Sequence, residues 1–189
     1  MLQRLSIVGA LLACPCLSTV SGCSGGPHSS LLLHSGLTNI VGVPQAAGSW
    51  TTKAPMLTAR EGLAVGVLNG ILYAVGGFSS DGPLNTVEAY NPATDTWTTK
   101  TPLPSTRWQL AASVIGDRLY VVGGCCDYNF NALNTVDAYN PVTDKWTRKA
   151  FMPTARRVLA AGTLRGRLYA VGGFSDGNIL DAAEAFNPQ

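Results

Sequence analysis

The sequence predicts an all-β protein made of three repeated units, and two observations carry this prediction. Trp50, Trp97 and Trp146 lie 47 and 49 residues apart, and a Gly-Gly pair begins 26 residues after each of them. Glycine (21 residues) and proline (11 residues) are frequent, as in proteins whose many short strands are joined by turns. Because these motifs keep the same phase in every copy, they indicate true repeats. The repeats occupy residues 49–96, 97–145 and 146–189.

Each repeat reads as four short strands. The first is small and apolar, the second is apolar and ends at Gly-Gly, and the third ends in Asn-Pro, which is a turn signal. The fourth strand begins at the tryptophan, and residues 49–53 are expected to form a fourth strand as well. In repeat order, the first strands cover 62–68, 110–115 and 158–164, the second strands 71–75, 119–122 and 168–171, and the third strands 86–90, 135–139 and 182–186.

These motifs resemble the kelch repeat. The resemblance is carried by Tyr-Ala-Val-Gly-Gly at 73–77, an acidic residue before Ala-Tyr-Asn-Pro at 89–92, and Thr-Asp-x-Trp at 94–97. The period of about 50 residues agrees with it, and the match extends over residues 50–189. The resemblance implies a kelch-type β-propeller of four-stranded blades around a central channel, with three blades present. It also implies that the repeated tryptophans pack between neighbouring blades.

Three blades are fewer than the roughly 4–8 of a closed propeller. If the 49–53 strand completes the last blade, as the resemblance to kelch propellers implies, the chain holds three full blades. Two explanations remain open. The chain could be half of a six-bladed ring assembled as a homodimer, or a truncated product of a longer gene. Truncation is preferred, because the motif at 187–189 stops abruptly. In either case unpaired strand edges favour association.

The N-terminus predicts export and anchoring. Arg4 precedes an apolar run at 5–17, which is the pattern of a signal peptide and is too short for a membrane span of about 20 residues. Residues 20–23, Val-Ser-Gly-Cys, resemble the bacterial lipobox. This resemblance implies a signal peptide at 1–22, a lipidated Cys23 and a location in the bacterial cell envelope, either periplasmic or on the cell surface. An ordinary cleaved signal peptide and cleavage before Cys14 remain alternatives.

Residues 23–48 then comprise the lipidated cysteine and a tether that opens with Ser-Gly-Gly-Pro. Two or more acyl chains on one cysteine would give stable attachment to a membrane. The kelch repeats occupy the remainder, 49–189.

An arginine lies 10 residues after each tryptophan, at Arg60, Arg107 and Arg156. At that phase the chain returns from the rim to the axis of a propeller, so we expect the three guanidiniums to converge at the channel mouth and bind an acidic ligand. By resemblance, kelch proteins that bind acidic partners use arginines at this phase. In the alternative interpretation, each arginine pairs with an acidic residue or carbonyls of a neighbouring blade. Repetition in every copy favours this structural role.

The loop at 125–131 breaks the repeat pattern and is two residues longer than its counterparts. Cys125 and Cys126 could form a strained vicinal disulfide outside the cytoplasm or remain two free thiols, and both interpretations stay open. Tyr128 and Phe130 give the loop an aromatic character that suits a binding contact.

The composition argues against several function classes. The formal net charge is only +2 and the basic residues form no tract, so no nucleic-acid partner is expected. A copper oxidase of the galactose-oxidase type shares the fold by resemblance, but its site needs histidines and none follows His34. No metal or cofactor is therefore expected, and no nucleophile–histidine pairing can be assembled in the repeats.

The expected function is a lipid-anchored binding module that presents propeller loops to a protein or glycan ligand of acidic character. An enzyme is the alternative: the resemblance to kelch-type sialic-acid mutarotases of bacteria implies a sugar mutarotase or epimerase. The third interpretation is an inert truncated product of a longer kelch gene. A fold by itself does not decide among these functions.

Overall fold

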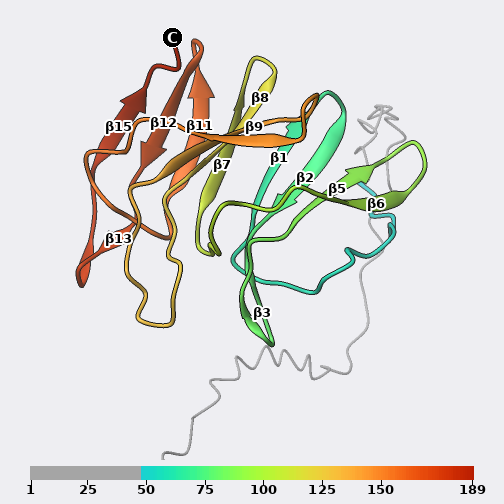
Figure 1. Ribbon diagram of the computed structural model, residues 1–189, viewed down its shortest axis with the longest axis horizontal. Helices are drawn as coiled ribbons and strands as arrows, with labels where there is room; N and C mark the ends of the chain where they lie inside the picture. Colours follow the sequence, from blue (N-terminus) through green and yellow to red (C-terminus); the bar gives the residue numbers. More distant parts are fainter. Residues whose placement is uncertain (1–47) are drawn as a thin grey trace, which may run out of the picture. The chain divides into compact units, whose positions relative to one another are not determined.

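Strands account for all regular secondary structure in residues 48–189, which are the residues that the computed structural model describes (Figure 1). The predicted signal peptide, Cys23 and the tether up to residue 47 lie outside the described residues. The folded unit begins at Ser49 and extends to Gln189.

Three antiparallel sheets, here called blades 1, 2 and 3, follow one another along the chain. Within each blade the strands pair in the order of the sequence, as an up-and-down meander. Blade 1 comprises β1 (Ala64–Leu68), β2 (Ile71–Val75), β5 (Val87–Asn91) and β6 (Thr96–Lys100). Blade 2 comprises β7 (Ala111–Ile115), β8 (Arg118–Val122), β9 (Val136–Asn140) and β10 (Lys145–Arg148). Blade 3 comprises β11 (Ala160–Leu164), β12 (Arg167–Val171) and β15 (Ala183–Phe186).

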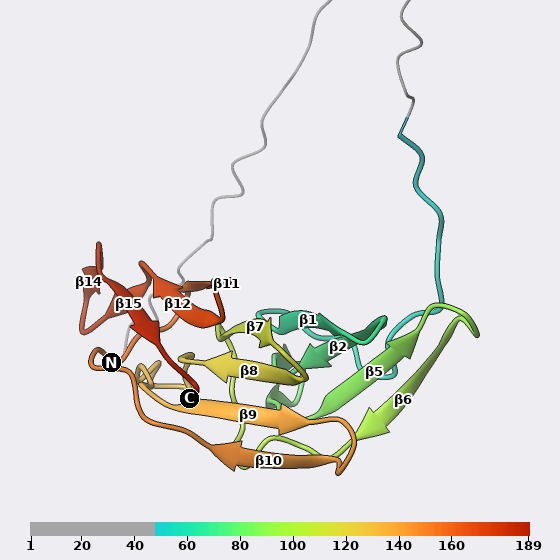
Figure 2. The ribbon, with the colours of Figure 1, turned by 90° about the horizontal axis from the view of Figure 1, so that it is seen from above.

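The blades pack face to face and fan out from their first strands. Strands β1, β7 and β11 lie side by side, and the later strands of each blade spread away from them (Figure 2). One apolar cluster fills the space between blades 1 and 2, and a second fills the space between blades 2 and 3. Tyr73 and Tyr139 meet edge to face at 5.6 Å in the first cluster. The all-β, partial-propeller prediction is therefore confirmed.

Two short hairpins were not predicted. β3 (Phe78–Ser79) pairs with β4 (Gly82–Pro83) in blade 1, and β13 (Phe174–Ser175) pairs with β14 (Asn178–Ile179) in blade 3. Blade 2 carries the longer loop 125–132 at the same phase. All three follow a Gly-Gly pair and project from the same side of the blades, which we call the loop face (Figure 1).

Residues 49–53 correct one detail of the prediction. They form no strand, and Trp50 is fully exposed. Blade 3 accordingly has three strands instead of four. The physical reason is that a fourth strand needs a sheet edge, and the edge of β5 is already occupied by β6 within blade 1.

Candidate binding face

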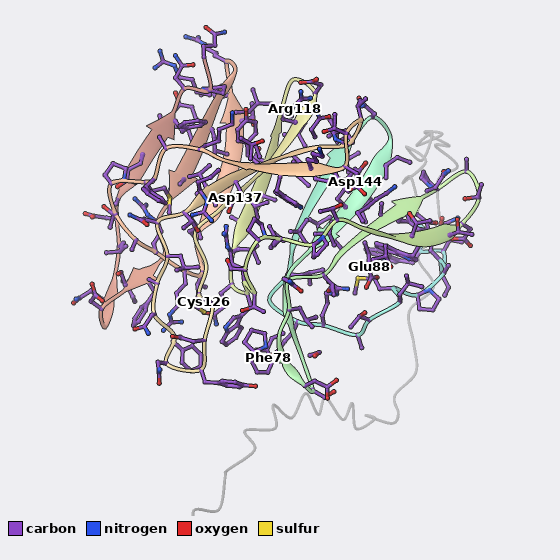
Figure 3. The ribbon with its side chains drawn as sticks, in the orientation of Figure 1. Phe78, Glu88, Arg118, Cys126, Asp137 and Asp144 are labelled. Carbon is purple, nitrogen blue, oxygen red and sulfur yellow. The ribbon has the colours of Figure 1, made fainter. Side chains whose placement is uncertain are left out.

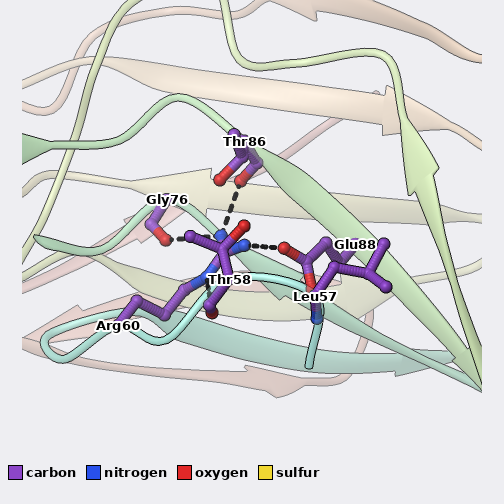
Figure 4. A network of polar contacts seen from close by, with 6 residues as sticks. All are labelled: Leu57, Thr58, Arg60, Gly76, Thr86 and Glu88. Carbon is purple, nitrogen blue, oxygen red and sulfur yellow. Dashed lines mark hydrogen bonds and ion pairs between the residues drawn. The ribbon is translucent and has the colours of Figure 1, made fainter. Parts of the chain in front are cut away.

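The repeated arginines lie inside the blades. The guanidinium of Arg60 donates to the carbonyls of Gly76 and Thr86 at 3.0 and 3.1 Å and forms an ion pair with Glu88 (Figure 4). Glu88 in turn accepts the backbone N–H of Leu57 at 2.9 Å. This network connects the segment that enters blade 1 to its second and third strands.

The other two arginines also form an ion pair with a carboxylate on the third strand of their blade. Arg107 is 0% exposed, and its Nη2 lies 2.6 Å from Asp137 Oδ2. Burial lowers the pKa of Arg107, and the Asp137 carboxylate opposes that effect. Asp137 Oδ1 also accepts from Arg148 Nε at 2.6 Å. Arg156 is likewise buried, 2.7 Å from Glu184.

These contacts support a structural role for the three arginines, but the partner lies in the same blade and not in the neighbouring blade that the alternative named. Each guanidinium is neutralised by a carboxylate of its own blade, on the third strand, and each side chain is 0% exposed. A positive funnel would require guanidiniums in contact with solvent. The role of Arg60, Arg107 and Arg156 in ligand binding stays a prediction, and their burial gives it no support.

Aromatic side chains gather on the loop face instead. Phe78 lies 4.8 Å from the Trp108 ring and meets Tyr128 edge to face at 5.8 Å. Phe130 also packs on Trp108, with the ring centres 5.1 Å apart. Figure 3 shows Phe78 at the end of the blades where the hairpins project. The predicted loop residues Tyr128 and Phe130 are thus part of a larger group that spans two blades, and both are exposed.

Arg157 extends this group to blade 3. Its Cζ atom lies 5.1 Å from the ring centre of Phe130 and 4.6 Å from that of Phe174. Its Nη1 donates to Gln109 Oε1 at 2.8 Å, which fixes the orientation of the guanidinium. Within residues 48–189, no carboxylate forms an ion pair with Arg157. A planar cation held between two rings is preorganised for a carboxylate.

We call this group the loop-face cluster, and it comprises Phe78, Trp108, Tyr128, Phe130, Arg157 and Phe174. Sequence reasoning found two of its members and missed the others. A signal was nevertheless present, because the residue after each repeated arginine differs between repeats. That position holds Glu61, Trp108 and Arg157, and in the structure each forms a β-bridge with the residue that follows Gly-Gly. Positions whose residue differs between the repeats can determine which ligand is bound, whereas the repeated arginines stabilise the blades.

Cys125 and Cys126 are both free thiols in the structure. Cys125 is buried, and burial raises the pKa of its thiol to about 11. Its Sγ lies 3.8 Å from the carbonyl oxygen of Trp108. A protonated, buried thiol is a poor nucleophile, so Cys125 serves here as a small packing residue beneath the cluster.

The described part of the chain holds no group of His, Cys, Asp and Glu side chains arranged to bind a metal ion. Nor does residue range 48–189 contain a helix of the length and apolarity needed to cross a membrane. The chemistry that the face itself offers is aromatic packing, one stacked guanidinium and hydrogen bonding.

The fold and this face together define the class: a β-propeller scaffold of stacked blades whose loops form a binding surface. The KLHDC2/KLHL20/DRC7 Kelch-repeats domain model matches residues 45–189. The chain therefore belongs to the kelch-repeat family. It is also similar to the human influenza virus NS1A-binding protein, with 50% identity over 42 residues. That match covers 22% of this chain and only 6% of the human protein.

Proposed function

We propose that this chain is a protein-binding module whose loop-face cluster takes a carboxylate and a neighbouring apolar or aromatic side chain of its partner. The observation that carries the proposal is Arg157, stacked between Phe130 and Phe174 with no carboxylate partner among the described residues. Its free edge can bind a carboxylate through parallel hydrogen bonds. Stacking on the two rings lowers the conformational entropy that the side chain loses on binding.

The rest of the cluster supplies the apolar part of the contact. Aromatic and arginine side chains are the residues that most often dominate the energy of protein interfaces. Tyr128 and Phe130 are exposed enough to be covered by a partner. Trp108 is nearly buried, and its indole N–H has no hydrogen-bond acceptor in the described structure.

A peptide selection tests this proposal. Random peptides displayed on phage and selected on the full chain are expected to be enriched in an acidic residue beside an aromatic or apolar one. Arg157→Gln should weaken a selected peptide at least about tenfold in fluorescence polarisation, as expected for a central interface arginine. Its melting temperature should hardly change, because the side chain is partly exposed.

Arg167→Gln is the matched control, because this arginine is exposed at the start of β12, at the opposite end of the blade from the hairpins. Equal loss of affinity in both variants would show that peptide binding depends on the net charge of the chain and not on Arg157, and would contradict the proposal. Binding to a glycan array with no enriched peptide would overturn the choice of a protein partner. The sugar mutarotase alternative stays a prediction, and no contact on the loop face favours it.

We further propose that the module is exported and anchored by a lipid on Cys23 in the bacterial cell envelope. The support is the leader sequence, with Arg4, the apolar run and the Val-Ser-Gly-Cys motif. Labelled palmitate should be incorporated into the chain in a bacterial host, and Cys23→Ala should abolish the label. Retention of label in Cys23→Ala with its loss in Cys14→Ala would move the site upstream, and no label in the unsubstituted chain would exclude the anchor.

A further inference from the structure

Gln109 lies in the segment that enters blade 2, next to Trp108 of the loop-face cluster. Its N–H donates to the carbonyl of Gly62 at 2.7 Å, and its own carbonyl accepts the N–H of Val158 at 2.9 Å. Gly62 precedes the first strand of blade 1, and Val158 precedes the first strand of blade 3. The backbone of Gln109 is therefore attached to the segments that enter both neighbouring blades, and its side chain starts from a fixed position.

The residue at this phase differs between the repeats. Gly62, Gln109 and Val158 all have a positive φ, of +57°, +54° and +54°. Only in blade 2 does the side chain at this phase form hydrogen bonds. Like the neighbouring position that holds Arg157 in blade 3, it is a candidate for a residue that determines which ligand is bound.

Two donors hold the amide oxygen of Gln109. Arg157 Nη1 donates to Oε1 at 2.8 Å, and the Sγ atom of Cys125 lies 3.7 Å from the same oxygen. A guanidinium can only donate. Burial raises the pKa of the Cys125 thiol to about 11, so at neutral pH this thiol keeps its proton and can also donate. Because both neighbours need an acceptor, the oxygen end of the amide must face them.

The nitrogen end of the amide is consequently a free donor. The hydrogen bonds of the Gln109 side chain within residues 48–189 both go to Oε1. Gln109 is half-buried, and Nε2 is not among the buried polar atoms that lack a partner. The two N–H groups of Nε2 therefore face solvent on the loop face.

These N–H groups lie beside the free edge of Arg157. Oε1 and Nε2 share one carbon atom, so Nε2 is adjacent to the guanidinium that Oε1 contacts. Arg157 donates from Nη1, whereas its Nη2 and Nε have no acceptor among the described residues. A charged donor and a neutral donor thus stand next to each other, and the two oxygens of one carboxylate can accept from both.

We propose that Gln109 contacts the ligand directly, with Nε2 donating to the same side-chain carboxylate of the partner that Arg157 binds. This inference rests on the proposed function and narrows the bound group to the side chain of an aspartate or glutamate. The amide of an asparagine or glutamine has the same shape, but its N–H groups would meet the donors of Gln109 and Arg157. Such a ligand is rejected because donors would be left facing donors.

Cys125 is a positioning residue that acts through Gln109 and does not touch the ligand. Phe78 and Phe174 occupy its phase in the other two repeats, and a phenyl ring has no N–H, O–H or S–H donor. The thiol is small and supplies a second donor to Oε1. The hydrogen bond from Cys125 therefore helps to keep Oε1 inward and Nε2 outward.

Fluorescence polarisation with an acidic peptide selected on the full chain tests the contact. The peptide is made with an amidated C-terminus, so that its carboxylates are all side chains. Gln109→Gly should weaken it about tenfold or more, because a hydrogen bond to a charged group is lost. This variant is expected to fold with an unchanged melting temperature, since glycine suits the left-handed backbone at residue 109.

Gln109→Glu distinguishes direct contact from a structural role. The unsubstituted chain should bind the acidic peptide more tightly than an analogue whose acidic residue is replaced by its amide. Gln109→Glu should reverse this order, because the peptide amide can then donate to the new carboxylate. Asn178→Asp is the matched control, since it makes the same change of charge at an exposed position on the hairpin of blade 3 and should leave the acidic peptide preferred.

Cys125 variants test the orientation of the amide. Cys125→Ala should weaken the acidic peptide at least about twofold, the low end for one hydrogen bond. Cys125→Ser should restore the affinity, because a hydroxyl of similar size can donate to the same oxygen. Equal affinities in all three chains would show that Cys125 does not orient Gln109.

The outcomes separate this contact from the proposed function. Weaker binding by Gln109→Gly together with the reversed preference of Gln109→Glu would support both. An acidic peptide that depends on Arg157 but binds Gln109→Gly with unchanged affinity would overturn the contact and leave the proposed function intact. If no acidic peptide is enriched, or if Arg157→Gln binds it unchanged, the proposed function is wrong and the contact by Gln109 is wrong with it.

Discussion

Arg107→Met is expected to lower the free energy of unfolding by about 3–5 kcal/mol, because it leaves the carboxylate of Asp137 buried without its main partner. Both side chains of this pair are 0% exposed. Arg148→Met should cost far less, since Arg148 is 42% exposed and a half-exposed ion pair is worth about 1 kcal/mol or less. Urea unfolding followed by circular dichroism, at one protein concentration, measures both.

A double variant separates the charge from the packing. Arg107→Met combined with Asp137→Leu should recover much of the loss, because a buried ion pair can often be exchanged for apolar side chains at little net cost. If Arg107→Met instead keeps its stability and loses only peptide binding, the repeated arginines belong to the ligand site and the scaffold role is wrong.

Gly76→Ala is expected to lower the free energy of unfolding by about 2–5 kcal/mol, with about 1–2 kcal/mol from the left-handed backbone and about 1–3 kcal/mol from overlap in a packed interface. Gly76 has φ +63°, and a Cβ there would lie 2.3 Å from the carbonyl oxygen of Arg107. That contact joins blade 1 to blade 2, where the N–H of Gly77 donates to the same carbonyl at 2.8 Å.

Gly70→Ala isolates the backbone contribution. Gly70 has φ +76°, but a Cβ there would meet nothing within 4 Å. Gly70→Ala should therefore lower the free energy of unfolding only by the contribution of the left-handed backbone, about 1–2 kcal/mol. The difference between the two variants in urea unfolding measures the close approach of the blades. Equal costs would show that blade 2 does not touch Gly76.

Most of the strands could be predicted from the sequence because their signals are local. The second strand of blade 1 was expected at 71–75 and lies at Ile71–Val75, since an apolar run between Asn-Gly and Gly-Gly leaves little choice. The hairpin of β3 and β4 was missed, because strands of two residues are too short to show a period. The strand expected at 49–53 is absent, because its pairing depends on an edge that the local sequence does not provide.

The candidate site could likewise be predicted only in part from the sequence. Arg156 and Arg157 are adjacent and chemically identical, yet one is buried against Glu184 and the other is stacked between Phe130 and Phe174. Because Arg156 recurs at the same phase in every repeat, the sequence analysis singled it out and passed over Arg157. Which of two neighbouring side chains points into the blade depends on the β-bridge between Arg157 and Phe174, which forms only when the loop closes on the hairpin.

The sequence by itself determined the repeats, the blade order and the family, because motifs at a constant phase and turns at Gly-Gly and Asn-Pro act over a few residues. Only the tertiary structure decided which side chains meet. The loop-face cluster joins residues as far apart as Phe78 and Phe174 through Trp108, Phe130 and Arg157. The physical reason is that these contacts cross between blades, and the distance along the chain carries no information about them until the sheets have packed.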